Sequence, residues 1–256
     1  MISKRLVGVV TVKDGWAVQS IGYRRWLPLG RPEVLVENLD RWGADEILLQ
    51  CVDRGARGPD FALLERLCKR GLSTPLIYQG GVRSVDDGVR VVQTGAERIA
   101  VDALLRDAPD TVAALAEPLG SQALIAALPL SCGADGRLLW LDARTRQSTP
   151  ITDAALALLA GGQVSEALVI DWQHEGQRHG FDLRLIDQFP LPRTRLIAFG
   201  GLSEAAQLRD VLERPDVVAA AVGNFLNYTE HAVQGLKECL LGLPMRAPSY
   251  QKPMWS

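Results

Sequence analysis

The sequence predicts a (β/α)8 barrel, and three observations lead to this prediction. The chain has 256 residues, which is the usual size of such a barrel when it folds as one domain. Short β-branched or aliphatic runs alternate with segments that carry helical spacing, and strands joined by helical crossovers must pair in parallel. The two halves of the chain also repeat. Eight such units in this length favour a closed barrel over an open, doubly wound sheet.

The eight predicted strands are short and are separated by segments with helical patterns. In chain order they cover residues 6–12, 46–49, 75–78, 98–101, 123–128, 167–170, 195–199 and 217–222. After the fifth strand, residues 129–150 are irregular, and the turn-like sequence Ala134-Asp135-Gly136 predicts a small β excursion there. We expect one barrel over residues 1–242 and an irregular tail over residues 243–256, which contains three prolines and Trp255.

The internal repeat has an offset of about 120 residues. It places Glu46 on Glu166 and the pair Gly80-Gly81 on Gly200-Gly201. Residues 58–60 fall on residues 180–182 at almost the same offset. These matches indicate two half-barrels of four units each, although a six-stranded or open arrangement is compatible with the same repeat.

Charge and composition exclude several classes of function. The chain has 28 basic and 30 acidic side chains and a formal net charge of −2, without the excess of Lys and Arg that binding to nucleic acid or an anionic membrane requires. No apolar run approaches the roughly 18 residues of a membrane helix, and the first residues show no secretory signal. We therefore expect a cytoplasmic protein that binds neither nucleic acid nor membranes.

The four cysteines lie far apart in the sequence, at Cys51, Cys68, Cys132 and Cys239. They show neither the CxxC pairs nor the neighbouring histidines that are typical of zinc sites. We therefore predict no metal site and no structural disulfide, and nothing in the sequence indicates a cofactor.

Two Gly-Gly pairs stand at the ends of predicted strands, each followed by a serine that can cap the next helix. In such a loop, backbone N–H groups can converge on an anion at the positive end of the helix dipole. Gly80-Gly81 and Gly200-Gly201 therefore predict two phosphate sites, and Gly223 and Asn224 are assigned to the same phosphate-binding set. Alternatively, the glycines only permit tight turns between strands and helices.

Charged residues begin four of the predicted strands. They are Arg5, Glu46, Arg98 and Glu166, at the first, second, fourth and sixth strands. Strand N-termini open onto the floor of a barrel, opposite the usual active-site face. Two arginines and two glutamates can form a closed ring of salt bridges there. Such a ring either plugs the barrel or gates the passage of something small.

Several short motifs spread along the chain point to a known family. They are Lys4-Arg5, Val12-Lys13-Asp14-Gly15, Gly30 with Pro32, Asp45-Glu46, the two Gly-Gly loops, Gly95-Ala96-Glu97-Arg98 and Ser121-Gln122-Ala123. With these motifs the sequence resembles the cyclase subunit of imidazole glycerol phosphate synthase, the HisF family. The resemblance runs from the first residue to about Tyr228 with few gaps.

The resemblance implies a barrel that docks a HisH-like glutaminase against its floor and receives ammonia through it. In the family a charged ring of four residues gates the ammonia, and the four strand-start residues named above match it, with Arg98 where a lysine is common. Glu97 matches an acidic residue that pairs with a lysine of the glutaminase, and Gln122 matches a floor residue near that interface. The family substrate carries two phosphates, which fits two Gly-Gly loops.

The sequence departs from the family at the opposite end of the barrel. The resemblance places the family's general acid and base, two aspartates, at Thr11 and Pro129, and neither residue exchanges a proton near neutral pH. Losing one positioned acid or base typically costs about 10² to 10⁴ in rate. The resemblance also aligns three other residues with different family residues. Gln19 occupies the position of a substrate-contacting lysine, Cys51 occupies that of an aspartate at the end of the second strand, and Asp102 occupies that of an asparagine at the first phosphate loop.

Two loop clusters at the same end of the barrel are weaker candidates. His174 stands beside Glu175 and could act as an acid or base, or could be a solvated loop residue. Arg24, Arg25 and Trp26 form a basic and aromatic cluster, which could contact a partner's surface or a nucleotide, or could be solvated.

Together, the residues and the resemblance predict a barrel that pairs with a glutaminase and conducts ammonia without the cyclisation of histidine biosynthesis. The resemblance implies a third enzyme as acceptor, one that converts the acetamide of a nucleotide sugar to an acetamidine for a surface polysaccharide. The first alternative is an active cyclase, a lyase, in which other side chains replace the aspartates. The second is a stand-alone barrel that binds a phosphorylated sugar and has no glutaminase partner.

Overall fold

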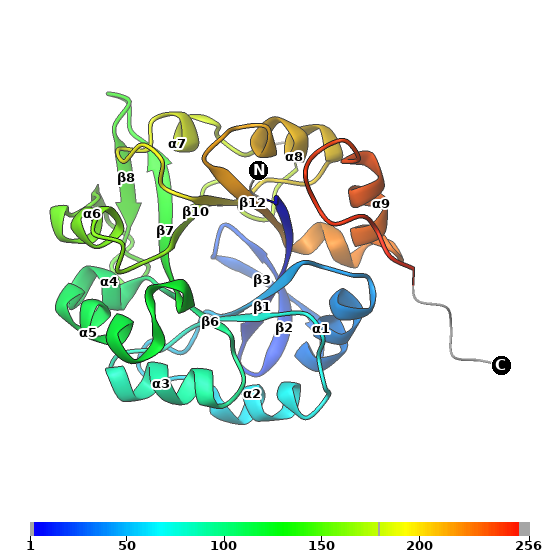
Figure 1. The fold of residues 1–256 in the computed structure, drawn as a ribbon, viewed down its shortest axis with the longest axis horizontal. Helices are drawn as coiled ribbons and strands as arrows, with labels where there is room; N and C mark the ends of the chain where they lie inside the picture. Colours follow the sequence, from blue (N-terminus) through cyan, green and yellow to red (C-terminus); the bar gives the residue numbers. More distant parts are fainter. Residues whose placement is uncertain (1–2, 179, 251–256) are drawn as a thin grey trace.

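A closed barrel of eight parallel strands forms the centre of the molecule in the computed structural model, which describes residues 3–178 and 180–250 (Figure 1). The strands are β1 (Arg5–Lys13), β4 (Glu46–Cys51), β5 (Leu76–Gln79), β6 (Arg98–Val101), β7 (Leu124–Cys132), β10 (Glu166–Asp171), β11 (Leu196–Phe199) and β12 (Val217–Val222). Each pairs in parallel with its neighbours, and the pairing of β12 with β1 closes the barrel. The predicted (β/α)8 barrel is therefore confirmed.

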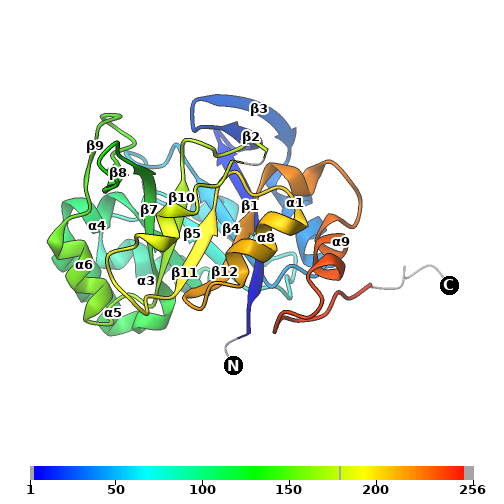
Figure 2. The same ribbon diagram turned by 90° about the horizontal axis from the view of Figure 1, so that it is seen from above.

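Helices surround the barrel in both views (Figures 1 and 2). They are α1 (Pro32–Arg41), α2 (Phe61–Cys68), α3 (Val85–Gln93), α4 (Ala103–Asp107), α5 (Pro109–Leu119), α6 (Asp153–Ala160), α7 (Arg184–Asp187), α8 (Ala205–Leu212), α9 (Ala232–Cys239) and the 3-10 turns η1 (Ser121–Ala123) and η2 (Asn224–Asn227). The start of α3 is as the sequence predicts: the Ser84 hydroxyl accepts the N–H of Asp87, and the Asp87 carboxylate accepts the N–H of Arg83, which caps the helix. After the second Gly-Gly pair the prediction was wrong, because the N-cap of α8 is Glu204 rather than Ser203.

Two antiparallel hairpins extend from the ends of barrel strands. β2 (Trp16–Ile21) pairs with β1 and with β3 (Arg25–Gly30), and β8 (Leu138–Leu141) pairs with β7 and with β9 (Ser148–Pro150). Figure 2 shows both hairpins at one end of the barrel, opposite the start of β1. We call this end the mouth and the opposite end the floor. The β2–β3 hairpin was not predicted, because its residues were expected to form a loop.

The apolar core has two parts. One part lies between the strands and the helices. The other fills the inside of the barrel with small and branched side chains, among them Val7, Leu48, Ala100, Leu168 and Ile197. Inward-facing residues alternate along each strand, so a single strand contributes to the floor, the interior and the mouth.

The two halves of the barrel make the same close backbone contacts. A Cβ atom on Gly80 would lie 2.5 Å from the carbonyl oxygen of Cys51, and one on Gly200 would lie 2.4 Å from that of Asp171. Both glycines also have positive φ. Glycine is therefore required at each position for two reasons, the close backbone contact and the backbone conformation. The contacts recur at the offset of the sequence repeat, which supports two similar half-barrels.

The predicted tail is described as far as Tyr250. Met245 forms an isolated bridge with Lys4 beside the start of β1, and residues 251–256, with Trp255, lie outside the described residues. Among the helices that the structure describes, none is long and apolar enough to span a membrane.

Candidate functional site

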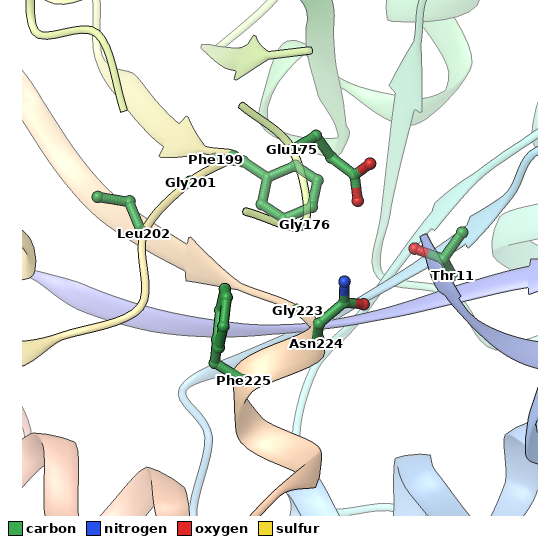
Figure 3. Close-up of a pocket in the computed structure, with 10 residues that line it drawn as sticks. Thr11, Glu175, Gly176, Phe199, Gly201, Leu202, Gly223, Asn224 and Phe225 are labelled. Atoms are coloured by element: carbon green, nitrogen blue, oxygen red, sulfur yellow. The ribbon is translucent and has the colours of Figure 1, made fainter. Parts of the chain in front are cut away.

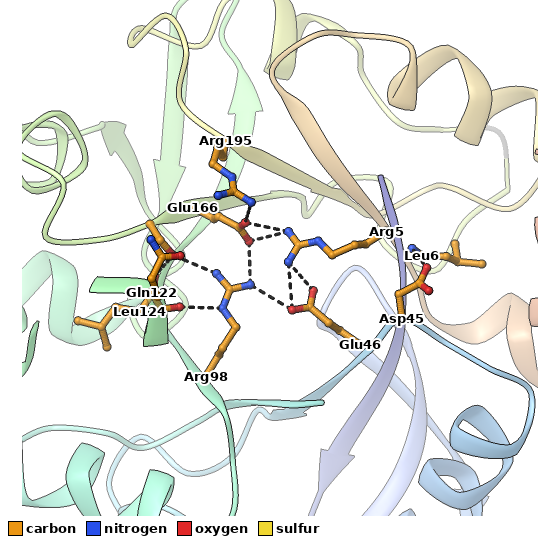
Figure 4. A network of polar contacts seen from close by, with 10 residues as sticks. Arg5, Leu6, Asp45, Glu46, Arg98, Gln122, Leu124, Glu166 and Arg195 are labelled. Carbon is orange, nitrogen blue, oxygen red and sulfur yellow. Dashed lines mark hydrogen bonds and ion pairs between the residues drawn. The ribbon is translucent and has the colours of Figure 1, made fainter. Parts of the chain in front are cut away.

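The floor of the barrel carries a network of charged side chains, which Figure 4 shows. Arg5 pairs with Glu46 at 3.0 Å and with Glu166 at 2.8 Å. Arg98 pairs with the same two carboxylates, at 3.2 Å and 2.8 Å. The structure therefore brings the four strand-start residues together as a closed ring of ion pairs. Each comes from a different strand. Arg5 lies two residues before Val7, which pairs with Glu46, and the tilt and stagger of barrel strands bring the strand starts together at one end.

A fifth residue, Arg195, joins this ring by pairing with Glu166 at 3.0 Å. It directly precedes β11 and could have been found in the sequence, because it occupies the same strand-start position as the other four. Burial acts to raise the pKa of Glu166, but Arg98 and Arg5 outweigh it and hold that pKa below its usual range. At Glu46 burial prevails over the same two arginines, and the pKa is raised. We call these five residues the floor ring.

The two predicted docking residues lie beside the floor ring and are exposed. The Glu97 carboxylate accepts the backbone N–H of Leu76 at 2.5 Å, so part of its hydrogen-bonding capacity is used within the chain. The backbone carbonyl of Gln122 accepts a hydrogen bond from Nε of Arg98 at 3.0 Å. This contact links the rim of the floor to the ring itself.

At the mouth, the two positions that the resemblance aligned with the family's aspartates are Thr11 and Pro129, and both have neutral side chains. Thr11 is buried, and its hydroxyl lies 3.5 Å from Oε1 of Gln50. Nε2 of Gln50 in turn donates a hydrogen bond to Oε1 of Gln79 at 3.1 Å. Pro129 lies beside Ile170 in the strand register. Neither position offers a group that titrates near neutral pH.

A cavity of about 490 Å³ opens at the mouth above these strands. Its lining includes the Gly80-Gly81 loop, Cys51, Asp102 and Pro129. Burial raises the pKa of Asp102 to about 7, although Arg106 at 3.8 Å and a hydrogen bond from Nε1 of Trp140 oppose the shift. Asp102 can therefore exchange a proton near neutral pH inside a cavity large enough for a small molecule.

The second glycine loop has no such space. Gly200, Gly201, Gly223 and Asn224 line a separate cavity of about 10 Å³ (Figure 3), which holds one water molecule at most. The two glycine loops, equivalent in sequence, are thus unequal in the folded chain.

The β2–β3 hairpin closes this second loop through three residues, Ser20, Glu175 and Asn224, which we call the latch. The amide of Asn224 donates to the carbonyl of Ser20 at 2.6 Å and accepts its N–H at 3.3 Å. The Glu175 carboxylate accepts the Ser20 hydroxyl at 2.9 Å and the N–H of Tyr23 at 3.2 Å. Burial raises the pKa of Glu175, while these hydrogen bonds oppose the shift. The sequence did not predict the latch, because its partners are far apart in the chain.

The remaining candidates occupy the mouth. Nδ1 of His174 lies 2.8 Å from Oδ2 of Asp171, rather than pairing with its neighbour Glu175. Arg24 lies 5.9 Å from the centre of the Trp172 ring, while Trp26 lines the mouth cavity. Within residues 3–178 and 180–250, no group of three or more His, Cys, Asp or Glu side chains is placed to hold a metal ion.

These features define a (β/α)8 barrel with a charged floor ring and a ligand-sized cavity at its mouth. The family model for histidine biosynthesis proteins matches residues 5–232, and the chain therefore belongs to that family.

Curated relatives agree with this assignment. The chain is 25% identical over 244 residues to the imidazole glycerol phosphate synthase subunit HisF of Natranaerobius thermophilus, covering 94% of this chain and 96% of that protein. It is 26% identical to the HisF subunit of Alkaliphilus metalliredigens and 27% identical to that of Xanthomonas campestris, with the same coverage of 94% and 96%. The chain is thus a distant HisF-like barrel.

Proposed function

We propose that this chain is the barrel subunit of a glutamine amidotransferase complex that binds a HisH-like glutaminase on its floor and conducts ammonia to its mouth. The observation that carries the proposal is the contrast between the two ends of the barrel. The floor keeps a closed ring of charged residues, whereas Thr11 and Pro129 leave the mouth without the family's acid and base. The relatives are themselves named as subunits, which supports a partner protein.

The floor ring suits a gate because its ion pairs can exchange partners without leaving a charge unpaired. Arg5 and Arg98 each contact both glutamates, so one contact can lengthen while another holds. Above the ring, the barrel interior is lined by apolar side chains. A small neutral molecule such as ammonia could pass this apolar layer, beyond which the described residues present polar side chains at the mouth, including Thr11 and Gln50.

We further propose that the ammonia leaves at the mouth for a separate acceptor enzyme, of the kind that amidinates a nucleotide sugar for a surface polysaccharide. The neutral residues at the mouth support a separate acceptor, since each lost acid or base costs about 10² to 10⁴ in rate. The names of the relatives favour the alternative, an active cyclase. Asp102 supports that alternative too, because its raised pKa would let it exchange protons.

Turnover separates the two functions. The purified chain is given the aminoimidazole ribonucleotide substrate of the cyclase with an ammonium salt, and a HisF subunit of ordinary sequence is the positive control. The conduit function predicts turnover at least about 10²-fold below the control. Turnover near that of the control would establish the cyclase and remove the need for a separate acceptor.

Partner binding is tested with the HisH-like glutaminase of the same organism. Mixing should raise glutamine hydrolysis, and Glu97→Lys should weaken this effect because it reverses a charge on the floor. Asp86→Lys is the matched control, since Asp86 is an exposed carboxylate at the start of α3, at the mouth end. Equal activation of both variants would place the partner elsewhere, and no activation by the unsubstituted chain would favour a stand-alone barrel.

A further inference from the structure

The β2–β3 hairpin ends in an open sheet edge. Among the described residues, β3 pairs with β2 alone, and no hydrogen bond joins the backbone of Arg25–Gly30 to any other described part of the chain. Figure 2 shows β3 farther from the barrel than β2. An edge strand of this kind offers its free N–H and C=O groups to a strand of another chain.

Apolar side chains are exposed on the same hairpin. The exposed fraction is 54% for Trp16, 39% for Leu27 and 37% for Leu29. Tyr228, which is 49% exposed, adds to them, because its hydroxyl accepts a hydrogen bond from Gln19, the residue that pairs with Leu27 in the strand register. Exposed apolar side chains gathered in one place mark a surface that another molecule covers.

The hairpin is also basic. Residues 15–32 contain three arginines, Arg24, Arg25 and Arg31, and no aspartate or glutamate, in a chain whose formal net charge is −2. All three arginines are exposed, and neither Arg24 nor Arg25 has a carboxylate of the described chain within ion-pair distance. The hairpin therefore favours a partner segment that carries negative charge.

The charge and the open edge together argue against other occupants of this surface. Two copies of β3 paired with each other would bring like-charged arginines together, which opposes association. Nucleic acids and anionic lipids would match the arginines, but they cannot pair with the backbone edge of a strand. Pro28 has no N–H and shortens the row of donors on β3, so a partner strand must gain part of its affinity from its side chains.

We propose that the β2–β3 hairpin is a docking site for an extended, acidic segment of another protein, which pairs with β3 and packs apolar side chains on Leu27 and Leu29. Arg25 and Leu27 lie on one face of β3, because successive side chains of a strand alternate. A segment with acidic and apolar residues at every second position would meet both. This interface lies at the mouth, opposite the floor where the glutaminase is proposed to bind, and it does not depend on ammonia passage.

Fluorescence anisotropy of short labelled peptides with the full chain tests this docking site. The peptides are an extended sequence of glutamate, valine and threonine, the same sequence with lysine in place of glutamate, and the acidic sequence with its backbone nitrogens methylated. We expect the acidic peptide to bind at least about tenfold more tightly than the other two, because only it has both the charge and the N–H groups that suit β3. Its binding should also slow amide hydrogen exchange in β3.

Charge reversal provides a matched pair of variants. Arg25→Glu should weaken binding of the acidic peptide about tenfold and strengthen binding of the lysine peptide, because an attraction becomes a repulsion. Arg137→Glu is the control, since Arg137 precedes β8 on the other hairpin and its side chain is 80% exposed; its affinity for the acidic peptide should be that of the unsubstituted chain.

Leu27→Asn tests the apolar contact and should also weaken binding of the acidic peptide. Equal affinity for the acidic peptide and its methylated form would overturn the proposal, as would equal losses in Arg25→Glu and Arg137→Glu. Tighter binding of single-stranded DNA or of anionic lipid vesicles than of the acidic peptide would assign the arginines to a different partner and would also overturn it.

Discussion

Asp102 is the residue at the mouth whose ionisation matters most. The resemblance aligned it with an uncharged asparagine, and it lines the cavity at the mouth. Its neighbours are Arg106, the Trp140 indole, and the carboxylates of Asp107 and Asp142. The charge of Arg106 lowers the pKa of Asp102, and the two other carboxylates raise it. Burial has the largest effect and raises this pKa to about 7.

This shift predicts that stability falls as the pH rises. An unfolded aspartate has a pKa of about 3.9, so between about pH 4 and pH 7 the folded state holds a proton that the unfolded state has lost, and the free energy of unfolding decreases with pH across this range. Asp102→Asn should therefore lose less stability than the unsubstituted chain between pH 5 and pH 8, by about 1 to 3 kcal/mol. Urea denaturation at both pH values measures this difference.

Glu117→Gln is a suitable control for that experiment, because Glu117 is an exposed carboxylate in the last turn of α5. It should show the pH dependence of the unsubstituted chain. If Asp102→Asn showed that same dependence, the raised pKa of Asp102 would be refuted.

At the scale of elements, the latch is one of several contacts that fix the β2–β3 hairpin to the barrel, beside the buried side chain of Ala17 and the hydrogen bond from Tyr23 to Gln50. Asn224 binds both backbone groups of Ser20, in the manner of one more strand residue. The hairpin otherwise continues antiparallel from the mouth end of β1. The latch is the part of this attachment that reaches the second glycine loop, through Asn224.

Removing the latch should loosen the hairpin without unfolding the barrel. Asn224→Ala deletes two hydrogen bonds of about 1 kcal/mol each, so amide hydrogen exchange in residues 16–30 should become about tenfold faster or more. Asn227→Ala, which removes only a contact of 3.5 Å to the carbonyl of Asn224, should leave these rates unchanged. Unchanged exchange in Asn224→Ala would mean that other contacts hold the hairpin.

At the scale of the whole molecule, the floor ring joins four sequence-distant strands and the residue before a fifth. Glu166 is the centre of this ring, since it contacts Arg5, Arg98 and Arg195 and is only 2% exposed. Glu166→Gln would leave three arginines around a neutral amide. Removing one partner of a buried ion pair typically costs about 3 to 5 kcal/mol.

We therefore expect Glu166→Gln to unfold at a lower urea concentration, with a loss of stability of about that size. Glu213→Gln is the matched control, because Glu213 forms an exposed helical pair with Arg209 at 3.9 Å, and such pairs contribute less than about 0.5 kcal/mol. Equal stabilities of the two variants would show that the ring does not stabilise the floor.

The sequence could predict the barrel and much of its floor because both follow from local pattern. Aliphatic runs mark the strands, and a charged residue at a strand start must reach the floor once the strands are parallel. The same argument could have predicted that Arg195 joins the floor ring. The latch was not predictable, because Ser20 meets Glu175 and Asn224 only after the barrel closes. No local pattern distinguishes the open glycine loop from the closed one.

The fifth member of the floor ring has a consequence for what could cross it. Three arginines against two glutamates leave the described ring with one excess positive charge. An ammonium ion about 4 Å away would be repelled by a few kcal/mol at the effective dielectric of a protein surface, whereas the neutral molecule would not. Under the proposed function, such a ring would select by charge, and a glutaminase partner would have to deliver its product as neutral ammonia.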